Sequence, residues 1–150
     1  MIDFTQILDN IWIGNLYCVL NNKFLNYFNI SAIVNVTKIN YRLNNSNKKI
    51  NYIQLPINDS NSYIDNMHMF MSLNRITNFI RENIIQGRNV FIHCEHGFSR
   101  SPSVLAAYLM RYHKLNIIKS IIFIKEKRNK CFKKIRFKFA LEKYYKHITN

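Results

Sequence analysis

The sequence is poor in the residues that interrupt regular structure and in acidic residues. Its 150 residues include only 3 Gly and 2 Pro, and 8 Asp plus Glu stand against 22 Lys plus Arg. The low Gly and Pro content excludes collagen-like and low-complexity chains, and a hydrophobic fraction of 48% argues against intrinsic disorder. No segment reaches the roughly 18 consecutive apolar residues of a membrane-spanning helix. We therefore expect a soluble protein with no membrane span, folded as one domain over residues 1–150.

Cysteine is also scarce. Cys18, Cys94 and Cys131 form neither a disulfide framework nor a paired zinc pattern, and the His residues lack metal-ligand spacing. The start of the chain, MIDFTQILDNIWIGN, has two acidic residues and no basic residue before its apolar segment, which is not typical of a secretory signal. We expect a protein without metal or cofactor in a reducing compartment, cytoplasmic or nuclear.

Positive charge is abundant, and it is concentrated near the C-terminus. The formal net charge is +14, and from Arg111 to Asn150 there are 13 basic residues against only Glu126 and Glu142. Two explanations remain open. Either an AT-rich genome enriches Lys, Asn and Ile, or this third of the chain forms a face that binds RNA or another polyanion.

Hydrophobic patterning predicts strands alternating with helices. The predicted strands are Ile11–Ile13, Ile33–Val36, Ile50–Ile57 and Val90–Ile92, and polar loops are expected at Asn40–Lys49 and Asn58–Asn66. The predicted helices are Met67–Ile85, Pro102–His113, Ile117–Lys127 and Arg136–Ile148. This order predicts an α/β fold with a central, mostly parallel sheet flanked by helices, in which chemistry takes place at the carboxyl ends of strands.

One strand end carries the strongest chemical signal, in the segment VFIHCEHGFSRSPSVLAAYLM. An apolar strand leads into Cys94, a short loop follows, and a helix begins near Pro102, where the missing N–H of proline costs nothing. The N–H groups of such a loop and the positive end of the helix form a cradle for anions. Gly97 permits a close backbone approach, and Arg100 supplies a fork for two phosphate oxygens.

The same electrostatic field stabilises a thiolate at Cys94. A sulfur anion beneath a bound phosphoryl group is placed for in-line attack on phosphorus, which would give a phosphocysteine. A lone Cys after an apolar strand is more often an inert buried thiol. Here the presence of Gly97, Arg100 and Ser101 favours the nucleophile.

These residues carry a resemblance to a known family. HCEHGFSRS resembles the His-Cys-x5-Arg-Ser/Thr signature of the protein tyrosine phosphatase superfamily, and the following SPSVLAAYLM is similar to its dual-specificity branch. IWIGN (residues 11–15), ISAIVNVT (30–37) and YIQLPIND (52–59) are similar to other segments of that family, so the resemblance covers most of the chain. The short chain resembles small viral, poxvirus-type members, which implies a host cell or virion setting.

The resemblance also implies a role for each residue of the signature. Cys94 is similar to the nucleophile and Arg100 to the residue that clamps phosphate. Ser101 is similar to the hydroxyl that assists release of the thiolate, and His93 to the residue that orients the cysteine. The substrate phosphate would be bound by Glu95, His96, Gly97, Phe98, Ser99 and Arg100. The family needs no metal, and its substrates are phosphorylated proteins.

A carboxylic acid is needed to protonate the leaving alcohol. Asp59 ends LPIND, where the family places its general acid, although it lies 35 residues before Cys94, which is more than usual. Asp65 is the alternative, and it can also be interpreted as an N-cap of the helix from Met67. We expect Asp59 to be the acid.

The leading hypothesis is a monomeric phosphatase that hydrolyses phosphotyrosine and phosphoserine or phosphothreonine through a phosphocysteine. Two departures from the family pattern stand beside it. Lys133 and Lys134 replace a common Pro-Asn pair, and His96 gives a partial match to the RNA 5′-triphosphatase branch. Alternatives are therefore an RNA 5′-triphosphatase, a phosphoinositide phosphatase, which is disfavoured because the loop lacks Lys, or a catalytically weak phosphate-binding module.

Overall fold

The computed structural model describes residues 1–43 and 49–150, so part of the loop expected at 40–49 lies outside the described residues. The strands are β1 Phe4–Leu8, β2 Ile11–Gly14, β3 Ile30–Asn35, β4 Asn51–Gln54 and β5 Asn89–His93. The helices are α1 Leu16–Val19, α2 Asn22–Tyr27, α3 Tyr63–Ile85, α4 Arg100–Tyr112, α5 Ile117–Lys127 and α6 Lys138–Thr149.

The five strands form one sheet in the order β1-β2-β5-β3-β4. β2, β5, β3 and β4 pair in parallel, and β1 joins β2 antiparallel at one edge. The predicted α/β class with a mostly parallel sheet is therefore confirmed. β5 lies at the centre, so the residue that follows it emerges at the middle of the sheet edge.

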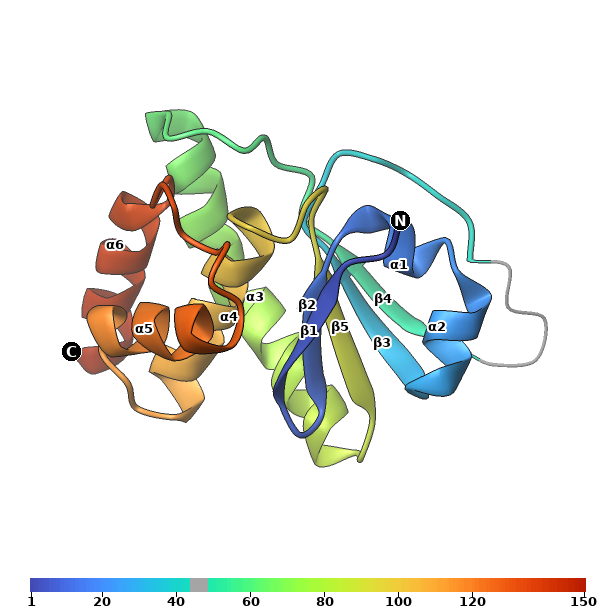
Figure 1. Cartoon of the computed structure of the whole chain (residues 1–150). Coiled ribbons are helices and arrows are strands. Elements are labelled where there is room, and N and C mark those ends of the chain that lie inside the picture. Colours follow the sequence, from blue (N-terminus) through green and yellow to red (C-terminus); the bar gives the residue numbers. More distant parts are fainter. Residues whose placement is uncertain (44–48) are drawn as a thin grey trace.

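Helices cover both faces of this sheet (Figure 1). Alternate residues of β5 point to opposite faces, as the pleat of a strand requires. Val90 and Ile92 join the larger core with α3, α4, α5 and α6, whereas Phe91 joins a smaller core with α1 and α2. α4 is buried from Ser101 to Met110, and it thus forms the central helix of the larger layer.

Several sequence predictions need correction. β1, α1 and α2 were not predicted, and β4 ends at Gln54 rather than at residue 57. α3 begins at Tyr63, four residues before the predicted start at Met67, because the Ser62 hydroxyl accepts the backbone N–H of Asp65 at 3.1 Å and caps the helix. Asp65 is therefore a first-turn residue, and its interpretation as an N-cap is wrong. α5 has the predicted bounds.

Two further observations concern the described residues alone. None of their helices has both the length and the hydropathy that crossing a membrane requires. No group of three or more His, Cys, Asp or Glu side chains in residues 1–43 and 49–150 is arranged to hold a metal ion.

Candidate active site

The loop of residues 94–99 connects the central strand to the central helix. β5 ends at His93, Cys94 follows directly, and α4 starts at Arg100 with Pro102 in its first turn, as the sequence predicts. The first N–H groups of α4 and the positive end of its dipole therefore face the loop. Figure 1 shows this loop at the same end of the sheet as the segment that joins β4 to α3.

The sulfur of Cys94 lies at the floor of the loop, and its side chain is almost fully buried. The backbone N–H of Gly97 donates to Cys94 Sγ at 3.2 Å, and Ser101 Oγ lies 3.2 Å from the same sulfur. Both groups can donate hydrogen bonds to a thiolate, which stabilises the anionic form. The loop thus brings together Cys94, Gly97 and Ser101 as the sequence predicts.

Gly97 has to be glycine for two separate reasons. Its φ is +79°, a conformation that side chains with a Cβ rarely adopt. A Cβ at this position would also lie 2.7 Å from the backbone of Gly14, where β2 ends. The loop of residues 94–99 is therefore packed backbone to backbone against the neighbouring strand.

The outer side of the loop is held by a buried arginine. Arg128 Nε donates to the carbonyl oxygen of Gly97 at 2.9 Å, and its Nη2 donates to the carbonyl oxygen of His96 at 3.1 Å. The same guanidinium forms a bidentate ion pair with Asp3, at 3.0 and 2.9 Å, and donates to Thr5 Oγ1. Because these carbonyls point outward to Arg128, the N–H groups of the loop are free to point inward.

Arg100 is held along only one edge of its guanidinium. Its Nη1 donates to the carbonyl oxygen of Ile57 at 3.1 Å, which ties it to the segment after β4. Its Nε is buried and has no hydrogen-bond partner, and Ser99 Oγ is in the same condition. Buried polar groups are nearly always satisfied in folded proteins, so these two donors point to an acceptor that a ligand supplies.

His93 is buried and neutral. Its Nδ1–H donates to the Cys94 carbonyl oxygen at 3.1 Å, and the Tyr41 hydroxyl donates to its Nε2 at 2.7 Å. Burial lowers the pKa of His93 to about 4, an effect that its hydrogen bond to Cys94 opposes and the charge of Arg100 reinforces. Burial also raises the pKa of Tyr41, so its hydroxyl keeps the proton that this bond needs. The imidazole therefore orients the backbone of Cys94 and carries no charge.

The other two cysteines have different surroundings. Burial raises the pKa of the Cys18 thiol to about 11 and that of Cys131 to about 12. Both remain protonated at neutral pH, and no disulfide is formed among the described residues. Cys18 and Cys131 are therefore inert buried thiols, the kind of cysteine that the sequence analysis gives as the alternative for Cys94.

Asp59 shares a hollow of about 190 Å³ with two residues of the loop, Phe98 and Ser99. Its side chain is 36% exposed, and its Oδ1 lies 3.5 Å from Arg136 Nε. Asp65 does not line this hollow. Its carboxylate accepts from Ser60 Oγ and, at 3.0 Å, from Ser62 Oγ, so it is engaged by the serines at the start of α3.

The remaining loop side chains lie at the surface. Glu95 and His96 are exposed and pair with each other at 3.4 Å, and the His96 ring stacks with that of Phe98. What the loop offers a phosphate is thus mainly its backbone together with Arg100 and Ser99. His96 contributes its carbonyl to Arg128, and its side chain is turned to solvent.

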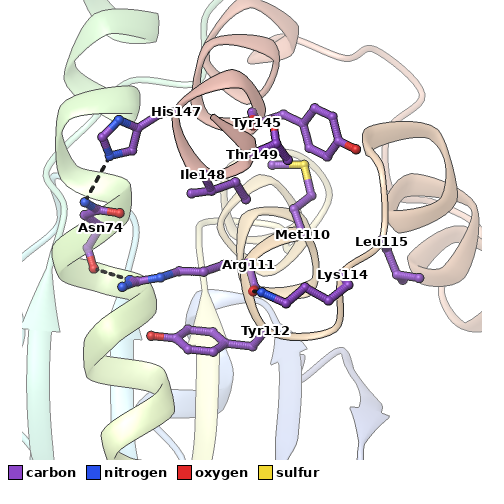
Figure 2. Close-up of a pocket in the computed structure, with 10 residues that line it drawn as sticks. All are labelled: Asn74, Met110, Arg111, Tyr112, Lys114, Leu115, Tyr145, His147, Ile148 and Thr149. Atoms are coloured by element: carbon purple, nitrogen blue, oxygen red, sulfur yellow. Dashed lines mark hydrogen bonds between the residues drawn. The ribbon is translucent and has the colours of Figure 1, made fainter.

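A larger hollow of about 440 Å³ lies elsewhere, between α3, the C-terminal end of α4 and α6 (Figure 2). Arg111 reaches Asn74 there, and the Asn74 amide also lies 3.4 Å from His147. Cys94 precedes the opposite end of α4, a 13-residue helix about 20 Å long. Asn74, Arg111 and His147 already contact one another in this hollow, so its size alone does not identify it as a reaction site.

Sequence reasoning missed three residues of the arrangement: Asp3, Tyr41 and Arg128. Arg128 lies in a run of basic residues. The sequence alone predicts that each of them is exposed to solvent, yet the side chain of Arg128 is only 4% exposed. Asp3 and Tyr41 are distant in sequence from the loop they support. Only the pairing of β1 with β2 and the fold of the segment after β3 bring them to it.

Comparisons with known proteins show the family to which the chain belongs. Residues 11–147 match the family model "Dual specificity phosphatase, catalytic domain". The chain is 28% identical over 146 residues to protein 123R of Invertebrate iridescent virus 6, which is named as a tyrosine phosphatase, covering 97% of this chain and 94% of that one. It is 27% identical over 143 residues to rat dual specificity protein phosphatase 5, covering 95% of this chain and 36% of the relative, so it spans about a third of that protein.

The fold has a close structural counterpart as well. The crystal structure of a variant of human DUSP28 superposes with a TM-score of 0.85 at 19% identity, covering 96% of this chain and 94% of that one. At that level of identity the match establishes the shared fold alone.

Proposed function

Since this chain belongs to the dual specificity phosphatase catalytic-domain family, we propose that it hydrolyses phosphotyrosine and phosphoserine or phosphothreonine in proteins through a phosphocysteine at Cys94. One observation carries the proposal. The Cys94 sulfur receives two hydrogen-bond donors at the end of β5, while Arg100 Nε and Ser99 Oγ lack partners nearby. This is the arrangement that a tetrahedral oxyanion above a sulfur anion requires.

In the first step, the thiolate of Cys94 forms a bond to phosphorus as the bond from phosphorus to the ester oxygen breaks. Arg100 and the N–H groups of the loop hold the three other oxygens, whose negative charge they stabilise. Asp59 donates its proton to the departing oxygen, so the alcohol leaves neutral. The products are the free hydroxyl of the substrate and a phosphocysteine.

In the second step, the Asp59 carboxylate accepts a proton from water as the water oxygen bonds to phosphorus and the bond from sulfur to phosphorus breaks. Ser101 Oγ, 3.2 Å from the sulfur, donates to the thiolate as it forms. His93 contributes through the Cys94 backbone, since its Nδ1–H holds the carbonyl of that residue in place. Inorganic phosphate is released, and no net proton is gained or lost by the enzyme.

Geometry supports Asp59 over Asp65 as the acid. Asp59 lies beside Phe98 and Ser99, and the carbonyl of Ile57 two residues earlier is bonded to Arg100. The clamp arginine and the acid are thus tied to the same segment. The Asp65 carboxylate is occupied by two serine hydroxyls.

Turnover of an aryl phosphate tests this assignment with three variants. We expect no turnover with Cys94→Ser, because the weaker nucleophile does not form the phosphoenzyme. Asp59→Asn lowers kcat about 10²–10³-fold, because the amide cannot protonate the departing oxygen. Asp65→Asn, the matched control, stays within about threefold of the wild type.

Labelled phosphate trapped on the denatured wild-type enzyme, and missing from Cys94→Ser, would identify the intermediate. Undiminished turnover by Cys94→Ser would overturn the proposal. Loss of activity in Asp65→Asn with full activity in Asp59→Asn would move the acid to Asp65.

RNA 5′-triphosphate is the second candidate substrate, because basic side chains surround the hollow beside the loop. The same Cys94 and Arg100 would act on its terminal phosphate. Release of phosphate from triphosphate-ended RNA, compared with release from phosphopeptides at equal concentration, decides between the two. A protein that binds phosphopeptides yet turns over no aryl phosphate would instead be a binding module. We further propose that residues 1–150 act as one monomeric catalytic domain in the cytoplasm or nucleus.

A further inference from the structure

The carboxylate of Asp59 has one charged partner. Its Oδ1 lies 3.5 Å from Arg136 Nε, and the side chains of Asp59 and Arg136 are 36% and 34% exposed. Lys130, Lys133 and Lys134 line the same hollow, but among residues 1–43 and 49–150 none of these lysines forms an ion pair with Asp59. The guanidinium of Arg136 is therefore the cation that holds this carboxylate.

The main chain on both sides of Asp59 is fixed, but that does not orient its carboxylate. Ile57 is buried, and its carbonyl oxygen accepts from Arg100 Nη1 at 3.1 Å. The Ser60 N–H donates to the Asn58 carbonyl oxygen at 3.1 Å, which closes a tight turn around Asp59. An aspartate side chain on a fixed backbone still has several staggered rotamers. A further contact is needed to keep the carboxylate over the loop.

Arg136 comes from a segment that is anchored at both ends. Its carbonyl oxygen accepts from Asn66 Nδ2 of α3 at 3.1 Å, and Asn66 Oδ1 accepts the N–H of Ala140 in α6 at 2.9 Å. At the other end of the segment, the N–H of Phe132 donates to the carbonyl oxygen of Phe98 in the loop at 2.9 Å. The side chain of Arg136 thus extends from a support that is tied to the loop and to α3.

This support distinguishes the ion pair from one between two mobile surface side chains. Such pairs contribute little, because both long side chains lose rotamer freedom when they meet. Here the main chain of residues 57–60 and that of residues 132–136 are each held by hydrogen bonds, so only the two side chains remain to be ordered. The loop, Asp59 and Arg136 therefore share one frame.

We infer that Arg136 is a positioning residue for the general acid, and that its contact with Oδ1 holds the Asp59 carboxyl over the loop with Oδ2 turned toward the departing oxygen. This inference rests on the proposed phosphatase activity and on the role of Asp59 in it. Oδ2 accepts no hydrogen bond from the part of the chain that the structure describes, so it is free to carry the proton. An acid transfers its proton only within hydrogen-bond reach of the leaving oxygen, so its orientation limits the rate.

The departing group decides how much the acid matters. Dinitrophenyl phosphate releases a stable phenoxide that needs no proton, whereas phenyl phosphate releases a basic phenoxide that does. For both esters kcat/KM reports the steps up to the departure of this group. The ratio of the two kcat/KM values thus isolates proton donation from phosphate binding and from attack by the thiolate, which both esters share.

Arg136→Ala tests the inference. We expect kcat/KM for phenyl phosphate to fall about three- to fivefold, since a half-exposed ion pair is worth about that much, and kcat/KM for dinitrophenyl phosphate to stay within about 1.5-fold of the wild type. Arg136→Lys restores the value for phenyl phosphate to within about twofold, because Lys Nζ lies one bond further from Cα than Arg Nε and can reach Asp59. Lys134→Ala, the matched control, removes a charge from the same hollow and leaves the ratio unchanged.

A double-variant cycle shows whether Arg136 acts through Asp59. We expect Asp59→Asn to lower kcat/KM for phenyl phosphate far more than for dinitrophenyl phosphate. Adding Arg136→Ala to Asp59→Asn should not change the ratio further, since a positioning residue has no effect once its target cannot donate a proton. Thermal unfolding of each variant checks that the protein is folded.

Three results would overturn the inference. An equal fall of kcat/KM for both esters in Arg136→Ala would show a purely structural role. An effect of the same size in the Asp59→Asn background would show that Arg136 does not act through Asp59. Equal rates for both esters relative to the wild type in Asp59→Asn would remove the acid from Asp59, and the inference with it, while the phosphocysteine would stand. A wild type that turns over neither ester would refute the proposed function itself and the inference that rests on it.

Discussion

Replacing Arg128 by Lys is the sharpest test of how the loop is held in its binding geometry. Arg128 donates to the carbonyls of His96 and Gly97, to both carboxylate oxygens of Asp3, and to Thr5. An ammonium keeps the charge but has one nitrogen, and it cannot reach the loop and β1 together. At least one buried carbonyl of the loop then lacks its partner.

The size of the effect follows from burial. A buried acceptor without a partner costs about 1–3 kcal/mol, and hydrogen bonds to a charged group contribute about 1.5–3 kcal/mol each. Arg128 is 4% exposed but the side chain of Asp3 is 41% exposed, so the part due to the ion pair is reduced by solvent screening. We expect Arg128→Lys to lower the free energy of unfolding by about 2–4 kcal/mol.

Oxyanion binding separates a positioning role from a purely structural one. With the Gly97 and His96 carbonyls released, the N–H groups no longer converge, and we expect the inhibition constant of vanadate to rise about 10- to 100-fold well below the unfolding temperature. Asp3→Asn, the matched control, leaves both loop carbonyls bonded to Arg128 and raises that constant by less than about threefold. If folded Arg128→Lys bound vanadate as tightly as the wild type, the loop geometry would not depend on this arginine.

Two further predictions concern His93 and Gly97. Because the pKa of His93 is lowered from 6.5 to about 4 in the folded protein, the unfolded chain binds the extra proton first as pH falls. The free energy of unfolding should thus drop by about 3 kcal/mol between pH 6.5 and 4, measured by urea denaturation, and a His93→Asn variant should lack this drop. Gly97→Ala forces a Cβ to within 2.7 Å of the Gly14 backbone, so kcat/KM for an aryl phosphate should fall more than about 100-fold, whereas Gly87→Ala, at a positive φ but with open space around it, should retain activity. Wild-type kinetics in Gly97→Ala would contradict the prediction for Gly97. An equal drop in the free energy of unfolding of His93→Asn would contradict the prediction for His93.

The central part of the fold could be predicted because local patterns and tertiary structure agree there. The apolar run before Cys94, the Pro in the first turn of α4 and the helical spacing over Ile117–Lys127 each indicate one structure. For β5 and α4, burial of nearly the whole element enforces it. The loop residues then follow, since they connect two predictable elements.

What could not be predicted depends on contacts between distant residues. β1 is a five-residue strand at the sheet edge whose partners are set by the antiparallel pairing with β2, and α1 and α2 have only 4 and 6 residues. α3 begins before the first residue of its apolar periodicity, because the helix is capped by Ser62. Ser62 lies in a polar stretch that the sequence alone indicates to be a loop. The role of Arg128 requires knowledge of both the loop and the first residues of the chain.

The pairing of Arg128 with Asp3 has a practical consequence for anyone who expresses this protein. A tag or a protease scar that displaces Asp3 would leave the buried Arg128 guanidinium without its carboxylate partner, and we expect such a preparation to bind oxyanions but to unfold more readily. Fusion partners are better joined after Asn150, which is exposed at the end of α6 and lies outside the loop of residues 94–99.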